Sequence, residues 1–201
     1  MRPVTSHHPV SSPDAHHDPL SNAMFGFWVF LMSDLILFAT IFVTYVVLYT
    51  GTAGGPTARD IFNLPFVLGE TLILLTSSFT VAVALVPVLK NNKNQVLFWF
   101  ALTFFLGLAF MAMELSEFRH LISEGNTWQK SAFLSSYFTL LGIHGLHMTG
   151  GLLFMILFNL QLWRRGLTPV MIMRLECLKL YWLFLTFIWM ICYSFVYLLG
   201  V

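Results

Sequence analysis

Long apolar runs alternate with short polar segments along this chain of 201 residues. Each run reaches the roughly 20 residues that an α-helix needs to cross the hydrocarbon core of a bilayer. The pattern therefore predicts an all-α membrane protein, a bundle of five transmembrane helices. The expected spans cover residues 25–49, 64–89, 95–117, 133–163 and 178–200.

Residues 1–24 differ from the rest of the chain because they are rich in Pro, Ser, His and Asp and have no apolar period. This composition is typical of a disordered tail. Its His pairs, at positions 7–8 and 16–17, could bind a transition metal, but a flexible segment gives them no fixed geometry, and a solvated tail is favoured. The first apolar run exceeds the roughly 7 to 15 residues of a signal-peptide core, so we expect a retained span within a transmembrane domain over residues 25–201.

Composition narrows the class of protein further. Hydrophobic residues make up 58% of the chain and charged residues 9%, whereas a soluble domain carries roughly a quarter charged residues. The formal net charge of +1 provides no basic surface for nucleic acid. Cys177 and Cys192 lie about 22 Å apart if they share one helix, which is too far for a disulfide.

The short links between spans predict that consecutive helices are antiparallel neighbours. Five spans place the two termini on opposite sides, and the distribution of Lys and Arg favours a cytoplasmic N-terminus and a periplasmic C-terminus. With that orientation the cytoplasmic segments hold Arg2, Lys90, Lys93, Arg164, Arg165, Arg174 and Lys179, against Arg59, Arg119 and Lys130 on the other side.

Several acidic and imidazole side chains fall inside or beside the apolar spans. Such groups are costly in lipid unless they face protein and have a partner, so each one is a candidate functional residue. We expect them to be structural polar residues or residues related to lipid or protons. They are Asp34, Glu70, Glu114, Glu117, His144 and His147.

The rise of 1.5 Å per residue places several of these groups in one layer. Glu70 and Glu114 lie about 8 Å below the same surface, and His144 lies about 9 Å below it. Asp34 enters from the opposite side and lies about 14 Å deep, near the midplane. The favoured interpretation is mutual pairing that fixes helix register, with Glu114 bonded to His144 or His147 and Glu70 bonded to a hydroxyl such as that of Ser77. A proton relay is the alternative.

Metal binding is a further interpretation of the same residues. Glu117 and His120 match the Glu-x-x-His element of di-iron bundles, but those proteins use two such elements and two further glutamates. A bis-histidine haem needs His residues on facing helices, whereas His144 and His147 share one span. We therefore expect no cofactor and no metal to be bound by this chain.

Small and aromatic residues add expectations about packing. Gly142, Gly145 and Thr149 fall on one face of the fourth span, nearly opposite the two histidines, so that helix should be packed on two faces. The tryptophans near the predicted interfaces are typical of an aromatic belt. They are Trp28, Trp99, Trp128, Trp163 and Trp182.

Three motifs resemble subunit III of the haem-copper terminal oxidases. They are GFWVFLMSD at residues 26–34, ELSEF at 114–118 and HGLHMTG at 144–150. The resemblance extends over nearly the whole chain from Phe25. Within this family the chain is most similar to the cytochrome bo-type ubiquinol oxidase branch, on the strength of residues 51–57, 60–68, 90–93 and 164–168. The number of spans also agrees with this branch, because the long form of the family has seven spans and this chain lacks the first pair.

The resemblance implies an accessory, non-catalytic subunit of a proton-pumping ubiquinol oxidase in the bacterial inner membrane. Subunit I of this family carries the haems, the copper and the proton channels, while subunit III binds phospholipid and supports stability and sustained turnover. The implied partners are oxidase subunits I, II and IV and phospholipids, and ubiquinol is the substrate of the complex. The family motifs cover every candidate residue except Glu70.

Other functions stay open on the sequence. A subunit III of a cytochrome c oxidase would carry similar motifs, because the electron donor binds elsewhere in the complex. A free-standing transporter is disfavoured, since the spans show no inverted repeat and Pro65 and Pro87 lie near span ends rather than at the midplane. An enzyme with its own di-iron site is the third alternative.

Overall fold

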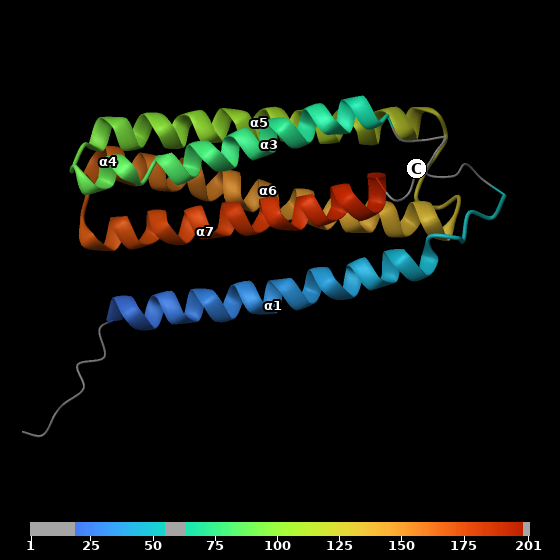
Figure 1. The fold of residues 1–201 in the computed structure, drawn as a ribbon, viewed down its shortest axis with the longest axis horizontal. Coiled ribbons are helices and arrows are strands. Elements are labelled where there is room, and N and C mark those ends of the chain that lie inside the picture. Colours follow the sequence, from blue (N-terminus) through green and yellow to red (C-terminus); the bar gives the residue numbers. More distant parts are fainter. Residues whose placement is uncertain (1–18, 55–62, 199–201) are drawn as a thin grey trace, which may run out of the picture.

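The computed structural model describes residues 19–54 and 63–198, and every regular element in these ranges is a helix. Within the described residues, five helical segments are long enough and apolar enough to cross a membrane. Their order along the chain is shown in Figure 1. The elements are α1 (Pro19–Leu48), α3 (Leu64–Val83), α4 (Val86–Leu89), α5 (Lys93–Ser123), α6 (Ala132–Arg165), α7 (Pro169–Cys192) and the π-helix η1 (Tyr193–Leu198).

The long helices lie side by side, and consecutive ones run antiparallel (Figure 1). Helices α3, α5, α6 and α7 form a closed four-helix ring, because α3 and α6 each pack against both α5 and α7. Helix α1 packs outside this ring against α6 and α7. We call the two ends of the bundle the Pro19 end, where α1, α5 and α7 begin, and the Ser123 end, where α3 and α6 begin.

Local sequence signals set the helix boundaries. A side-chain oxygen that accepts a backbone N–H satisfies one of the free donors in the first turn of a helix. Gly166, with φ of 73°, ends α6 in a backbone conformation that favours glycine. The capping residues are Asn92 for α5, Ser131 for α6 and Thr168 for α7.

The helices differ from the predicted spans mainly at their ends. Helix α1 begins at Pro19, so the last residues of the expected tail are helical, while residues 1–18 of that tail lie outside the described residues. Helix α7 begins at Pro169 rather than at Leu178. Its first turns contain Arg174, which interrupts the apolar pattern without interrupting the helix. The second span is divided into α3 and α4 around Ala84 and Leu85.

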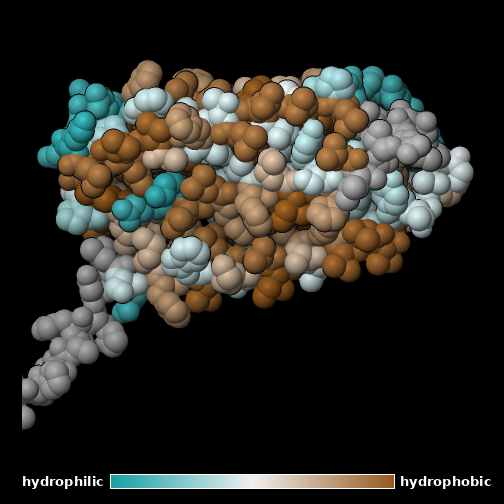
Figure 2. Space-filling model, in the orientation of Figure 1, coloured by the Kyte–Doolittle hydropathy of each residue, from teal (hydrophilic) through white to brown (hydrophobic). Residues whose placement is uncertain are grey.

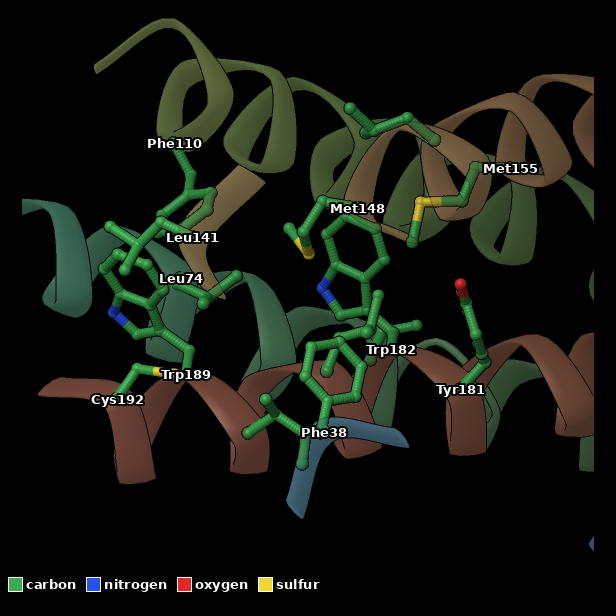
Figure 3. Close-up of a cluster of buried hydrophobic side chains, with 14 of the residues drawn as sticks. Phe38, Leu74, Phe110, Leu141, Met148, Met155, Tyr181, Trp182, Trp189 and Cys192 are labelled. Carbon is green, nitrogen blue, oxygen red and sulfur yellow. The ribbon is translucent and has the colours of Figure 1, made fainter. Parts of the chain in front are cut away.

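Trp182 lies at the centre of the ring, fully buried. Its indole is held between two glycines, since a Cβ on Gly107 of α5 would lie 2.6 Å from the ring and a Cβ on Gly151 of α6 would lie 3.1 Å from it. Figure 3 shows the indole of Trp182 beside Met148 in the buried cluster. The expectation that Trp182 belongs to an interfacial belt is therefore wrong.

The outer surface of the bundle is apolar over most of its length. Figure 2 shows hydrophobic side chains along the bundle and hydrophilic ones gathered mainly towards its two ends. This distribution suits a bundle that presents its sides to lipid or to neighbouring membrane helices and its ends to water. Large exposed side chains include Phe25, Ile36, Phe79, Phe105 and Leu146.

Candidate functional site

Asp34 and His147 join α1 to α6. Asp34 is 7% exposed, and its Oδ1 lies 3.0 Å from Nε2 of His147. The other ring nitrogen of His147, Nδ1, lies 2.8 Å from the carbonyl oxygen of Ile143 on the same helix. The hydroxyl of Tyr181 donates to the backbone carbonyl of His147 at 3.1 Å, so α7 contacts the same position.

The geometry of His147 fixes the number of protons that this pair holds. A carbonyl oxygen only accepts hydrogen bonds, so Nδ1 carries a proton. A carboxylate facing the bare lone pair of Nε2 would be repelled by it, so a proton must lie between Nε2 and Oδ1. Whether Asp34 or His147 carries it, the pair has zero net charge. It can therefore lie within a membrane span at a lower cost than a lone carboxylate.

His144 lies in a box of aromatic rings and is fully buried. Its ring centroid is 5.1 Å from Trp189, 6.0 Å from Phe110 and 6.5 Å from Phe38. Nε2 lies 3.2 Å from the carbonyl oxygen of Leu185 on α7 and so acts as the donor. Nδ1 has no hydrogen-bond partner among the described residues. This arrangement suits a neutral imidazole that ties α6 to α7.

Glu117 is bonded to two tyrosines at the Ser123 end of the ring. Its Oε1 accepts the hydroxyl of Tyr137 at 3.1 Å, and the hydroxyl of Tyr197 lies 3.4 Å from both of its carboxyl oxygens. The two tyrosine hydroxyls are 2.9 Å apart. Tyr197 belongs to the π-helix η1, which follows α7 directly, and its side chain is buried.

Glu70 and Glu114 lie in the same region of the ring but make no such bonds. Glu70 is 0% exposed and Glu114 is 2% exposed. Within residues 19–54 and 63–198, none of their four carboxyl oxygens has a hydrogen-bond partner. The carboxyl group of Glu114 rests against α6 at Gly145, where an added Cβ would lie 3.4 Å from either oxygen.

The predicted pairings of the glutamates are wrong. Glu114 bonds neither His144 nor His147, because His144 is directed to α7 and His147 to α1. Neither carboxyl oxygen of Glu70 has a hydrogen-bond partner among the described residues, and the hydroxyl of Ser77 instead accepts the indole N–H of Trp182. The expectation that Gly145 lies on a closely packed face is met by its contact with Glu114, whereas nothing lies within 4 Å of a Cβ at Gly142.

Several hydroxyl groups of α3 form hydrogen bonds to α7 and α5 that the sequence did not predict. Trp182 donates to Ser77 at 2.7 Å, and Trp189 donates to Thr71 at 3.1 Å, so both indoles of α7 are bonded to α3. Thr80 bonds Thr103 of α5 at 2.9 Å. The available signal was the cluster of Ser and Thr between positions 71 and 80, within an otherwise apolar span. Hydrogen bonds of this kind hold helices together inside membranes.

The described part of the chain contains no group of three or more His, Cys, Asp or Glu residues that could hold a metal ion. The two members of the Glu-x-x-His element face different partners. Glu117 bonds the tyrosines, while the exposed His120 lies 3.3 Å from Glu124.

Comparison with known proteins places this bundle in a family. The model of the family "Cytochrome c oxidase subunit III" matches residues 13–201. The chain belongs to the cytochrome c oxidase subunit III family. The three motifs of the resemblance thus identified the family correctly, and membership agrees with a multi-pass membrane protein.

Similar members of the subunit III family carry a more specific name. The chain is 51% identical to the cytochrome bo(3) ubiquinol oxidase subunit 3 of Pseudomonas aeruginosa, over 93% of this chain and 90% of that protein. It is 48% identical to the protein of the same name from Pseudomonas putida, over 92% and 89% of the two chains. The chain is also 41% identical to the protein of the same name from Buchnera aphidicola subsp. Schizaphis graminum, over 90% of this chain and 96% of that protein.

Proposed function

We propose that this chain is the accessory subunit III of a cytochrome bo-type ubiquinol oxidase, a complex that oxidises ubiquinol and reduces oxygen to water while pumping protons. The observation that carries the proposal is near full-length similarity to relatives named as subunit 3 of such oxidases. The alternative, subunit III of a cytochrome c oxidase, is not favoured by those names.

The internal geometry supports a structural rather than a catalytic role. The polar side chains of α6 are bonded to neighbouring helices, since His147 joins α1 and His144 joins α7. The indoles of α7 are bonded to hydroxyls of α3. These contacts join α1 to α6, α6 to α7 and α7 to α3, and they serve to hold the helices in register. The chain would bind no cofactor, and subunit I would carry the haems and the copper.

The expected surroundings follow from the same assignment. The bundle would lie in the bacterial inner membrane beside oxidase subunits I, II and IV, with phospholipids on its apolar sides. The N-terminus would be cytoplasmic, so the Ser123 end would face the periplasm. This orientation rests on the excess of Lys and Arg near the Pro19 end.

Purification of the complex through a tag on this chain tests the proposal. We expect the chain to co-purify with haem- and copper-containing subunit I and with a subunit II that lacks a copper centre. The preparation should oxidise ubiquinol. A subunit II with its own copper centre, together with oxidation of cytochrome c, would instead assign the chain to a cytochrome c oxidase. Recovery of the chain without any oxidase subunit would contradict both assignments.

A further inference from the structure

Three glutamates lie on the facing helices α3 and α5 towards the Ser123 end of the ring. Glu114 and Glu117 lie about one turn apart on α5, and Glu70 is buried on α3, which packs against α5. The ion pairs recorded among the described residues are His120 with Glu124 and His147 with Asp34, and neither involves this group. A buried carboxylate without a cation or a donor costs so much free energy that it takes up a proton instead. Three negative charges therefore cannot coexist here.

The hydrogen bonds distinguish the three groups. Glu117 accepts hydroxyl donors from Tyr137 on α6 and Tyr197 on η1, which stabilise a carboxylate. Glu70 and Glu114 receive no donor from the described residues, and both are almost completely buried. The arrangement thus suits one anion at Glu117 and two neutral acids behind it.

Among the described residues, the titratable groups beside the three carboxyls include Tyr137 of α6, Tyr197 of η1 and, beside Glu114, the thiol of Cys192 of α7, none of which carries a positive charge. His120 lines the same pocket as Glu117, but it is exposed and lies 3.3 Å from Glu124. Protonation is therefore the way in which the carboxyls of Glu70 and Glu114 can be neutralised within the described bundle.

A pocket lined by both polar and apolar side chains lies at the Ser123 end of the bundle and reaches Glu117. Its volume is about 240 Å³, enough for several water molecules. Asn63 immediately precedes α3 and His120 lies in the last turn of α5, so the pocket lies level with the end of the bundle. The lining residues are Asn63, Phe66, Ser116, Glu117, His120 and Leu121.

We propose that Glu70, Glu114 and Glu117 form a proton-binding site that exchanges protons with water at the Ser123 end of the bundle. Glu114 or Glu70 transfers its proton to the carboxylate of Glu117, and Glu117 exchanges that proton with water in the pocket. Glu117 then returns one proton to the inner carboxylate, so the net charge of the site does not change. No oxidant or reductant is needed. The site goes beyond the accessory role, and it is independent of the electron donor of the complex.

Infrared spectroscopy of the intact purified complex tests this site. The carbonyl stretch of a protonated carboxyl group shifts when water is replaced by D₂O, whereas a carboxylate has no such band. We expect wild-type minus Glu70→Gln and wild-type minus Glu114→Gln difference spectra each to show one protonated carboxyl band that shifts in D₂O. Glutamine has nearly the shape of glutamic acid, so both variants keep the packing.

Access through the pocket is tested with a matched pair of substitutions on α5. Ser116→Phe places a ring in the pocket, whereas Leu115→Phe changes the neighbouring exposed position outside it. We expect Ser116→Phe to slow the deuterium shift of both bands by about tenfold or more, because exchange then requires local opening of the bundle, and Leu115→Phe to leave it within about twofold.

Any of three results would overturn the proposal. Difference spectra without a protonated carboxyl band would show that Glu70 and Glu114 are ionised. Bands that do not shift in D₂O, or that shift equally fast in Ser116→Phe and the wild type, would show that the pocket is not the route of exchange.

Discussion

Substitution of Gly107 by alanine tests how the centre of the ring is packed. The new Cβ would lie 2.6 Å from two atoms of the Trp182 indole and 3.1 Å from Leu152. Carbon atoms in contact are ordinarily about 3.5–4.0 Å apart, so the ring would have to move by about 1 Å. On the other side of the indole, a Cβ on Gly151 would lie 3.1 Å from the Trp182 ring, so the indole has little room to move away from Gly107. The indole N–H is also bonded to Ser77, which opposes any tilt of the ring.

The expected cost follows from these contacts. Overpacking a close-packed interior costs about 1–3 kcal/mol, while the gain in helix propensity from glycine to alanine is at most about 1 kcal/mol. Gly142→Ala provides the control, because it makes the same chemical change in a neighbouring helix with nothing within 4 Å of the new Cβ. The free energy of unfolding should therefore differ between the two variants by about 1–3 kcal/mol.

The assay is retention of the subunit in the purified complex after heating, followed on native gels. We expect Gly107→Ala to lose the subunit at a lower temperature than the wild type and Gly142→Ala to match it. In the double variant Gly107→Ala/Trp182→Phe the smaller ring should remove most of the clash. Equal retention of the two alanine variants, or no relief in the double variant, would refute the packing account.

Three further substitutions address individual contacts, with retention of the subunit as the common measurement. Asp34→Ala leaves Nε2 of His147 without its partner and should weaken the attachment of α1 by about 3 kcal/mol, as expected for a broken buried pair. Trp189→Phe removes the bond to Thr71 and should cost about 1 kcal/mol. His144→Ala removes the tie to α7 and should lower retention and prolonged activity, while the haem content of the complex stays unchanged.

Exposed neighbours on the same helices provide the controls for Asp34→Ala and Trp189→Phe. Ser33→Ala changes an exposed position beside Asp34, and Phe187→Leu changes an exposed aromatic residue of α7. Both should behave as the wild type. Loss of haem or copper in His144→Ala would contradict a structural role for that residue, and wild-type retention of Asp34→Ala would show that the pair does not hold α1.

The depth of the buried polar side chains could be predicted from the sequence, but their hydrogen-bond partners could not. Depth along a helix follows from residue number alone, so Glu70 and Glu114 could be assigned to one layer. The direction in which a side chain faces depends also on how the helix is rotated in the bundle. His144 and His147 are separated by about 60° around the axis of α6. That angle is enough to direct His144 to α7 and His147 to α1, and neither to Glu114.

The sequence by itself determined the number of membrane-capable helices, the candidate polar residues and the family, because apolar runs and local motifs are readable without knowledge of neighbours. Only the tertiary structure decided which groups are partners, why Trp182 is central and how Tyr197 reaches Glu117. These outcomes depend on the rotation and close approach of whole helices, set by contacts at Gly107, Gly145 and Gly151 between residues distant in the chain.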